Sequence, residues 1–197
     1  MCNNLFLWLK LETGGLASAM EGDTKGSQCY PIFEAIAVVT DMELNEIESY
    51  RKAVYQDDAD IMRSHSDAFQ MHTQSGLLSE VADSGSYLSD IERELIELLQ
   101  SCGAEPFSYQ ASAVAVLAGQ NMSNHELQFV IDQMPSLRRF LHYSVFDLST
   151  LMMGEAIWMP EAVHEREAYC DWSDDSPKAK VTRMIQNAKY FKNSLSK

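Results

Sequence analysis

The chain has 197 residues, of which 46% are hydrophobic and 10% aromatic, so it can bury the core of a globular domain and is not a disordered chain. Its formal net charge of −14 argues against the broadly basic surface of proteins that bind long nucleic acids. No apolar run reaches the roughly 18 residues of a membrane-spanning helix, and no basic segment of the signal-peptide kind opens the chain. We therefore expect a cytoplasmic protein without membrane association.

Hydrophobic alternation predicts three strands in the first third of the chain, over residues 4–11, 31–41 and 44–56, the last two joined by a hairpin turn. The first strand has two different faces. One face presents Leu5, Leu7, Leu9 and Leu11, and the other presents Phe6, Trp8, Lys10 and Glu12. A polar, glycine-containing stretch over residues 18–28 predicts a loop, and a helical pattern follows over residues 58–72.

The rest of the chain alternates between helices and strands. The patterns predict helices over residues 86–103, 124–134 and 150–158, strands over 112–119 and 143–149, and a long helix from residue 177. The order β-β-β-α-α-β-α-β-α-α indicates the α/β class, with an antiparallel hairpin joined to parallel central strands.

The positions of the cysteines and of the basic residues give two further expectations. The four cysteines Cys2, Cys29, Cys102 and Cys170 lie far apart and form no zinc pattern or disulfide framework, so we expect reduced, mostly buried thiols. The segment from residue 177 onward is basic and contains no acid. Its basic side chains are those of Lys178, Lys180, Arg183, Lys189, Lys192 and Lys197. This segment either packs against the acidic remainder of the chain or forms a recognition patch.

Several stretches, taken in order, resemble the oligoribonuclease family, which comprises 3′-5′ exonucleases of the DEDDh class with an RNase H-like fold. They are LETGGL at 11–16, VVTDMELNEI at 38–47, HTQSGL at 72–77, AGQNMSNHELQFVIDQMPSLRRFLHYSVFDLST at 118–150, and KYFK at 189–192. The resemblance spans nearly all of residues 1–197 apart from an insertion over 17–30. It implies a single domain with a mixed sheet flanked by helices.

The resemblance also implies a catalytic site, and here the sequence departs from the family. The family holds two divalent metals with four carboxylates and uses a histidine as general base. Glu12 keeps one acid and Glu126 matches a second, but Lys10, Asp175 and Lys180 stand at the first aspartate, the histidine and the final aspartate. We expect Glu12 and Glu126 to be remnants paired with the two lysines, with no metal and no cofactor bound.

Four other positions match residues that bind substrate in the family. They are Leu16, an apolar wedge against a base; His72, a base-stacking ring; Tyr143, which reaches into the partner subunit's site; and Ser149, which contacts phosphate. Two positions depart from the family pattern. Met122 replaces a serine, and Ser144 replaces an arginine that would clamp phosphate. Leu16, His72 and Tyr143 could equally be retained for packing.

Other polar residues admit two interpretations. His125 and His164 are candidate surrogate bases, but we expect lone histidines of this kind to lie on the surface. The acidic stretch at 171–176 could supply replacement metal ligands, but it reads more naturally as a loop that caps the last helix through Asp174 or Ser176. The methionine-rich stretch at 150–159 indicates core or dimer contact.

Three functions follow from these observations. The first is an oligoribonuclease-like protein that has lost catalysis and acts as a binding or structural component, with short RNA as a candidate ligand. We expect it to form a homodimer, or a heteromer with another protein, through residues 134–143. The second is an active exonuclease that uses Mg²⁺ or Mn²⁺ at Glu12, Glu126 and either Asp174 or Asp175. The third is a nucleotide-binding sensor.

Overall fold

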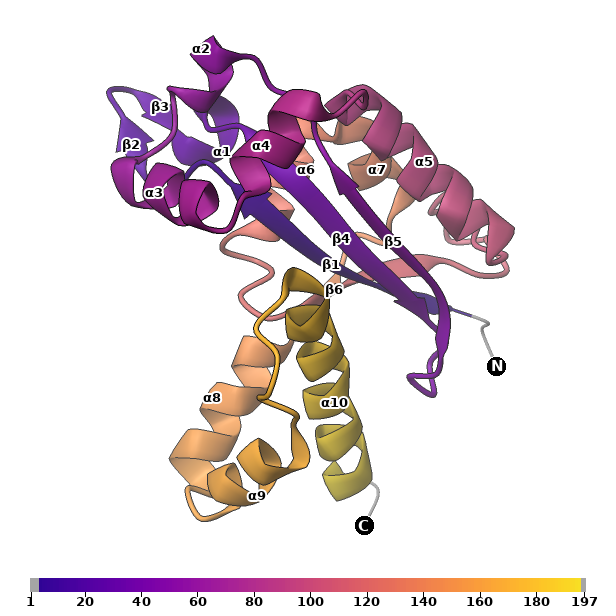
Figure 1. The fold of residues 1–197 in the computed structure, drawn as a ribbon. Coiled ribbons are helices and arrows are strands. Elements are labelled where there is room, and N and C mark those ends of the chain that lie inside the picture. The colour runs from indigo at the N-terminus through magenta and orange to yellow at the C-terminus, as the bar shows by residue number, and fades with distance from the viewer. Residues whose placement is uncertain (1–3, 196–197) are drawn as a thin grey trace.

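The computed structural model describes residues 4–195 and has a five-stranded mixed sheet at its centre, in the order β5-β4-β1-β6-β7 (Figure 1). The strands are β1 (Leu5–Thr13), β4 (Ile32–Thr40), β5 (Glu46–Ala53), β6 (Ala115–Gly119) and β7 (Val145–Asp147). β4 lies antiparallel to both β1 and β5, whereas β6 is parallel to β1 and β7 is parallel to β6. The predicted α/β class, with an antiparallel hairpin beside parallel strands, is therefore confirmed.

The two faces of β1 enter two different cores, as the alternation predicted. Its four leucines belong to the larger core, together with helices α5 (Leu88–Ser101), α6 (Glu126–Gln133) and α7 (Pro135–Phe140). Phe6 and Trp8 belong to the opposite core, which α10 (Pro177–Leu195) covers with Val181, Met184 and Phe191. Lys10 and Glu12 continue that second face, so they point toward α10 at the end of the strand.

The remaining helices lie around the edges of the sheet. They are α1 (Gly26–Cys29), α2 (Asp58–Ile61), α3 (Ser66–Gln74), α4 (Leu77–Asp83), α8 (Leu148–Trp158) and α9 (Ala162–Tyr169). Figure 1 shows α8, α9 and α10 grouped together beside the sheet. A buried chain of polar contacts joins these three helices: Arg166 donates to Glu155 at 2.5 Å and to Asn187 at 2.8 Å.

Two expectations about local structure are wrong. The stretch at 18–28 is not simply a loop, because it contains the short hairpin β2 (Met20–Glu21) and β3 (Thr24–Lys25) and the start of α1. The helix expected over 58–72 is broken into α2 and α3. The break has a physical cause, since the backbone N–H of His65 donates to the carbonyl of Gly14 at 2.7 Å and its ring accepts from Asp67 to cap α3.

Four helices, α1, α4, α7 and α9, were not predicted. The start of α7 carried a readable signal, because Pro135 is its first residue and proline is favoured at that position. Cys29, Cys102 and Cys170 are free thiols, while Cys2 lies outside the described residues. Within residues 4–195, no helix combines the length and the apolar character needed to cross a bilayer.

Candidate functional site

The site is built where β1 ends, between the first turn of α6 and the first turns of α10. Residues two apart on a strand point to the same face, so Lys10 and Glu12 both face this junction. Two glycines follow the strand and allow close packing there. A Cβ on Gly14 would lie 2.7 Å from the ring of Pro31, and one on Gly15 would overlap the ring of Tyr30.

Lys10 is paired with Glu126, the first residue of α6. The Nζ of Lys10 donates a hydrogen bond to Oε1 of Glu126 at 3.0 Å. The Glu126 side chain is 2% exposed, and this burial raises its pKa. The Lys10 ammonium and the backbone N–H groups of Leu11 and Glu126 act in the opposite direction and favour the ionised carboxylate. The two side chains thus form a buried pair of opposite charge.

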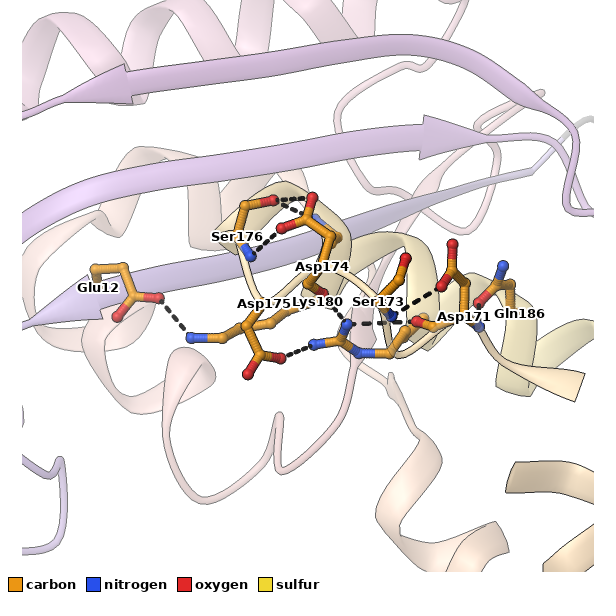
Figure 2. Close-up of polar contacts among 10 residues, drawn as sticks. Glu12, Asp171, Ser173, Asp174, Asp175, Ser176, Lys180 and Gln186 are labelled. Carbon is orange, nitrogen blue, oxygen red and sulfur yellow. Dashed lines mark hydrogen bonds and ion pairs between the residues drawn. The ribbon is translucent and has the colours of Figure 1, made fainter. Parts of the chain in front are cut away.

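Lys180 reaches the same place from α10. Its Nζ lies 3.7 Å from Oε1 of Glu12, and the Glu12 residue is buried. Figure 2 draws this ion pair as a dashed line. The prediction that Lys180 lies beside Glu12 is therefore confirmed. A third carboxylate, that of Glu34, lies on the neighbouring strand opposite Glu12 and contacts Arg51. Burial raises the pKa of Glu34 as well.

Asp175 lies in the loop before α10 and does not join the two glutamates in an acidic cluster. Its carboxylate accepts a hydrogen bond from Arg183 at 2.9 Å, and its side chain is 90% exposed. The neighbouring Asp174 accepts from the backbone and the hydroxyl of Ser176, and the Ser176 hydroxyl accepts from the backbone N–H of Ala179 (Figure 2 shows the Asp174–Ser176 contacts). These bonds confirm the prediction that the loop caps the last helix.

The expectation that His125 lies on the surface is wrong. His125 lies inside the site. Its Nε2 is 3.4 Å from the hydroxyl of Thr13, and its Nδ1 accepts a hydrogen bond from the backbone N–H of Ala17 at 3.4 Å. Burial, followed by the nearby Lys10 charge, lowers its pKa to about 4. Its position directly before Glu126 was the available signal. His164, by contrast, has a side chain that is 91% exposed, as expected.

Two of the four predicted substrate-binding residues border the site. Leu16 is 67% exposed and lines both clefts, so its apolar side chain is accessible to a ligand. His72 is only 2% exposed, its Nε2 donates to the carbonyl of Thr13 at 3.0 Å, and its ring meets Phe33 edge-on. Burial lowers the pKa of His72, so the ring is a neutral wall of the site.

Tyr143 and Ser149 lie farther out. Tyr143 is 58% exposed and stacks on His142, with 4.3 Å between the ring centroids. The Ser149 hydroxyl accepts from the backbone of Asn121 at 2.8 Å, which helps hold Asn121 at its positive φ of 59°. Met122, at the position of a family serine, is fully buried and would contact any Cβ on Gly119, so it is a core residue.

Two clefts meet at the site. The larger, of about 620 Å³, lies between β1, the start of α6 and α10, and the smaller, of about 460 Å³, lies between the end of β1 and α3. Three residues, Lys10, Leu16 and His125, line both clefts. The two clefts therefore form adjoining chambers on either side of these side chains.

The residues present do not fit a centre of two divalent metals. Of the four carboxylates that the resemblance implies, Glu12 and Glu126 are present, and an ammonium group lies 3.7 Å from the first and 3.0 Å from the second. At such separations an ammonium group would repel a divalent cation strongly. Within residues 4–195, no three His, Cys, Asp or Glu side chains are grouped so that they could hold a metal ion.

Comparison with known proteins finds relatives among the curated oligoribonucleases. The chain is 28% identical over 158 residues to an oligoribonuclease of Vibrio campbellii, covering 80% of this chain and 78% of the relative. It is 26% identical to a probable oligoribonuclease of Dictyostelium discoideum, over 78% of this chain and 73% of the relative. It is 25% identical to an oligoribonuclease of Francisella tularensis, over 96% of this chain and 94% of the relative. No family model matches the chain.

The fold has solved counterparts among exonucleases. Exonuclease I from Methylocaldum szegediense matches with a TM-score of 0.66 at 15% identity, over 98% of this chain but 41% of the exonuclease. The chain therefore spans about two fifths of that enzyme. A 3′-exonuclease that recognises a histone mRNA stem-loop matches with a TM-score of 0.58 at 10% identity, over 98% of this chain and 84% of the enzyme. The resemblance seen in the motifs is confirmed: the chain is similar to curated oligoribonucleases over most of its length, and its fold is the RNase H-like fold of the exonucleases that it matches.

Proposed function

We propose that this chain has lost 3′-5′ exoribonuclease activity and binds a short phosphate-bearing ligand, such as an RNA oligonucleotide, without cleaving it. The observation that carries the proposal is the pairing of Lys10 with Glu126 at 3.0 Å and of Lys180 with Glu12 at 3.7 Å. Each lysine stands where the family resemblance places an aspartate. The two positive charges take the electrostatic place of the metals.

The electrostatics of the site support this proposal. A carboxylate removed from water needs a compensating charge or strong hydrogen bonds. In the family that charge comes from metal ions, whereas here the ammonium groups supply it from within the chain. A divalent cation that entered would have to displace them and would meet two positive charges in a partly buried site. We infer that the site is stable without metal.

The other parts of the catalytic machinery are also altered. Asp175, at the position of the family base, is bound to Arg183 and points to solvent. Ser144, at the position of the phosphate-clamping arginine, has no guanidinium to offer. His125 does lie in the site, but its depressed pKa of about 4 makes it a weak base near neutral pH.

The open clefts favour a binding role over a purely structural one. The larger cleft keeps a volume of about 620 Å³ and is bordered by Lys10, Lys180 and the side chains of Asn121 and Asn124. Ammonium and amide groups of this kind suit phosphate and nucleobase atoms. We further propose that the protein acts as a homodimer, or with another protein, and that it works in the cytoplasm, where its three described free thiols would stay reduced.

A nuclease assay tests the proposal. RNA of two to five nucleotides is incubated with the purified protein in Mg²⁺ or Mn²⁺, and its binding is measured in parallel in EDTA. We expect binding in EDTA and no shortening of the RNA in either metal. The contrary result is shortening that disappears in Glu12→Ala. It would favour an active exonuclease with a rearranged site at Glu12, Glu126 and either Asp174 or Asp175.

A further inference from the structure

A large aromatic side chain that has no role in capping α10 borders the cleft from the loop before that helix. Trp172 lies in the loop before α10 and is 58% exposed. It lines the 620 Å³ cleft together with Leu16 and Lys180. An indole left this exposed beside a cleft offers apolar surface that a planar ring can cover.

A hydrogen bond at Nε1 and a cation on one face of the ring hold the indole of Trp172 in place. Its Nε1 donates to the carbonyl of Glu167 at 2.9 Å, and the guanidinium of Arg183 lies 5.0 Å from the ring centroid. Arg183 is itself held in place, because it donates to Asp175 at 2.9 Å and to the carbonyl of Asp171 at 3.4 Å, and it is 8% exposed. The ring is therefore positioned before any ligand arrives, which lowers the entropy cost of binding.

The charges that surround the ring specify the kind of ligand. Lys10 and Lys180 border the same cleft, and because an ammonium group has three N–H donors, each can donate to a phosphate oxygen as well as to its glutamate. Amide side chains border it as well, namely those of Gln120, Asn121, Asn124 and Asn187. A ligand that combines an anionic phosphate with a flat hydrogen-bonding ring suits this lining better than an apolar molecule does.

We infer that Trp172 is a stacking platform for one nucleobase of the ligand, supplied by the loop at 171–176. The inference rests on the proposed function and adds a subsite to it. Stacking of a base on an aromatic side chain tolerates different bases, because every base presents a flat face. The subsite therefore contributes affinity for nucleotides in general rather than selection of one sequence.

The test measures binding of 5′-phosphorylated diadenylate by calorimetry in EDTA, using the full chain and two matched variants. Trp172→Leu removes the aromatic ring but keeps an apolar side chain. Trp158→Leu makes the same change at a tryptophan on α8 that is 79% exposed and does not belong to the cleft lining. We expect Trp172→Leu to raise the Kd by about tenfold or more and Trp158→Leu to leave it unchanged. Trp172→Phe should fall between the parent and Trp172→Leu.

The outcomes separate this inference from the proposed function. Equal Kd values for the parent and Trp172→Leu would overturn the platform and leave ligand binding intact. An equal loss in both leucine variants would also overturn it, because the effect would then not belong to the cleft. Absence of binding by the parent would overturn the proposed binding function and the platform with it. A quench of indole emission by the ligand in Trp158→Leu, but not in Trp172→Leu, would support the platform independently.

Discussion

Lys10 and Glu126 are separated by 116 positions in the sequence, yet their side chains are joined by a 3.0 Å hydrogen bond between opposite charges. The bond connects the central strand β1 to the first turn of α6. The N-terminal end of a helix favours a negative charge, so Glu126 is stabilised both by Lys10 and by the helix itself. This one contact gives the buried carboxylate of Glu126 a charge of opposite sign within hydrogen-bond distance.

Removal of Lys10 should destabilise the fold. In Lys10→Met the buried Glu126 loses its partner, and we expect the free energy of unfolding in urea to fall by about 2 to 3 kcal/mol. This expected loss of unfolding free energy is no larger than the smallest loss, about 3 kcal/mol, that is typical of breaking a fully buried ion pair, because the Lys10 side chain is 21% exposed. The double variant Lys10→Met with Glu126→Leu should recover much of the loss. If the two single changes simply add in the double variant, the pair is not coupled.

Lys180 provides the matched comparison on the other side of the site. Its side chain is 40% exposed, and its ammonium group is 3.7 Å from Glu12. We expect Lys180→Met to lower the free energy of unfolding by less than about 1 kcal/mol, because exposed ion pairs contribute little. A loss as large as that of Lys10→Met, measured by the same urea titration, would show that Glu12 depends on Lys180 more than this geometry implies.

The pH dependence of stability should carry a contribution from His125. The pKa of His125 falls from 6.5 to about 4 in the folded protein, through burial first and the Lys10 charge second. The neutral ring therefore contributes stability that is fully present above pH 6.5 and is lost as the pH falls through 4. In His125→Gln this contribution is absent, so the parent should lose more unfolding free energy than the variant as the pH is lowered over that interval.

The matched control for this titration is His164→Gln, because the His164 side chain is 91% exposed. Urea unfolding of all three proteins at several pH values within the interval gives the comparison. Parallel curves for the parent and His125→Gln would contradict the burial of a neutral His125.

The buried ion pair between Glu155 and Arg166 should matter for the group of helices α8 to α10. Both side chains are almost fully buried, at 1% and 5% exposed, and their atoms are 2.5 Å apart. We expect Arg166→Met to lower the free energy of unfolding by about 3 to 5 kcal/mol, because an uncompensated charge remains inside the protein. Arg166→Met with Glu155→Leu should be closer to the parent. A double variant as unstable as the single one would show that packing, not charge, causes the loss.

The sequence predicted the features that depend on local pattern. The alternation in β1 placed its leucines and its Phe6–Trp8 face in separate cores, and the order of strands and helices gave the class of the fold. The position of Lys180 beside Glu12 was also predicted, but from the family resemblance rather than from periodicity. Motifs that are continuous in the sequence therefore carried most of the prediction.

What the sequence could not provide depends on contacts between distant segments. The break between α2 and α3 arises from the bond of His65 to Gly14, which no local pattern contains. The contact between the backbone of Ala17 and the ring of His125 likewise joins segments that are 108 positions apart. The role of Trp172 likewise depends on a carbonyl and a guanidinium that hold it beside the cleft.

Dimer formation can be tested with side chains that the fold leaves free. Leu141 is 2% exposed and belongs to the core, so its substitution would test folding rather than association. Tyr143 is 58% exposed, and we expect Tyr143→Ser to shift the protein from dimer toward monomer in light scattering. Tyr169→Ser is the control, since Tyr169 is 47% exposed and its ring lies beside Tyr190 rather than beside residues 134–143. A monomeric parent, or an unaffected dimer in Tyr143→Ser, would count against the interface.

The central claim is that two lysines have taken the place of the metals, and calorimetry with Mn²⁺ tests it most directly. The parent should give no binding heat at the site, because the ammonium groups of Lys10 and Lys180 already compensate Glu126 and Glu12. Lys10→Asp with Lys180→Asp exchanges two positive charges for two negative ones beside the glutamates and should gain measurable Mn²⁺ affinity. Tight Mn²⁺ binding by the parent that Glu12→Ala abolishes would contradict the claim.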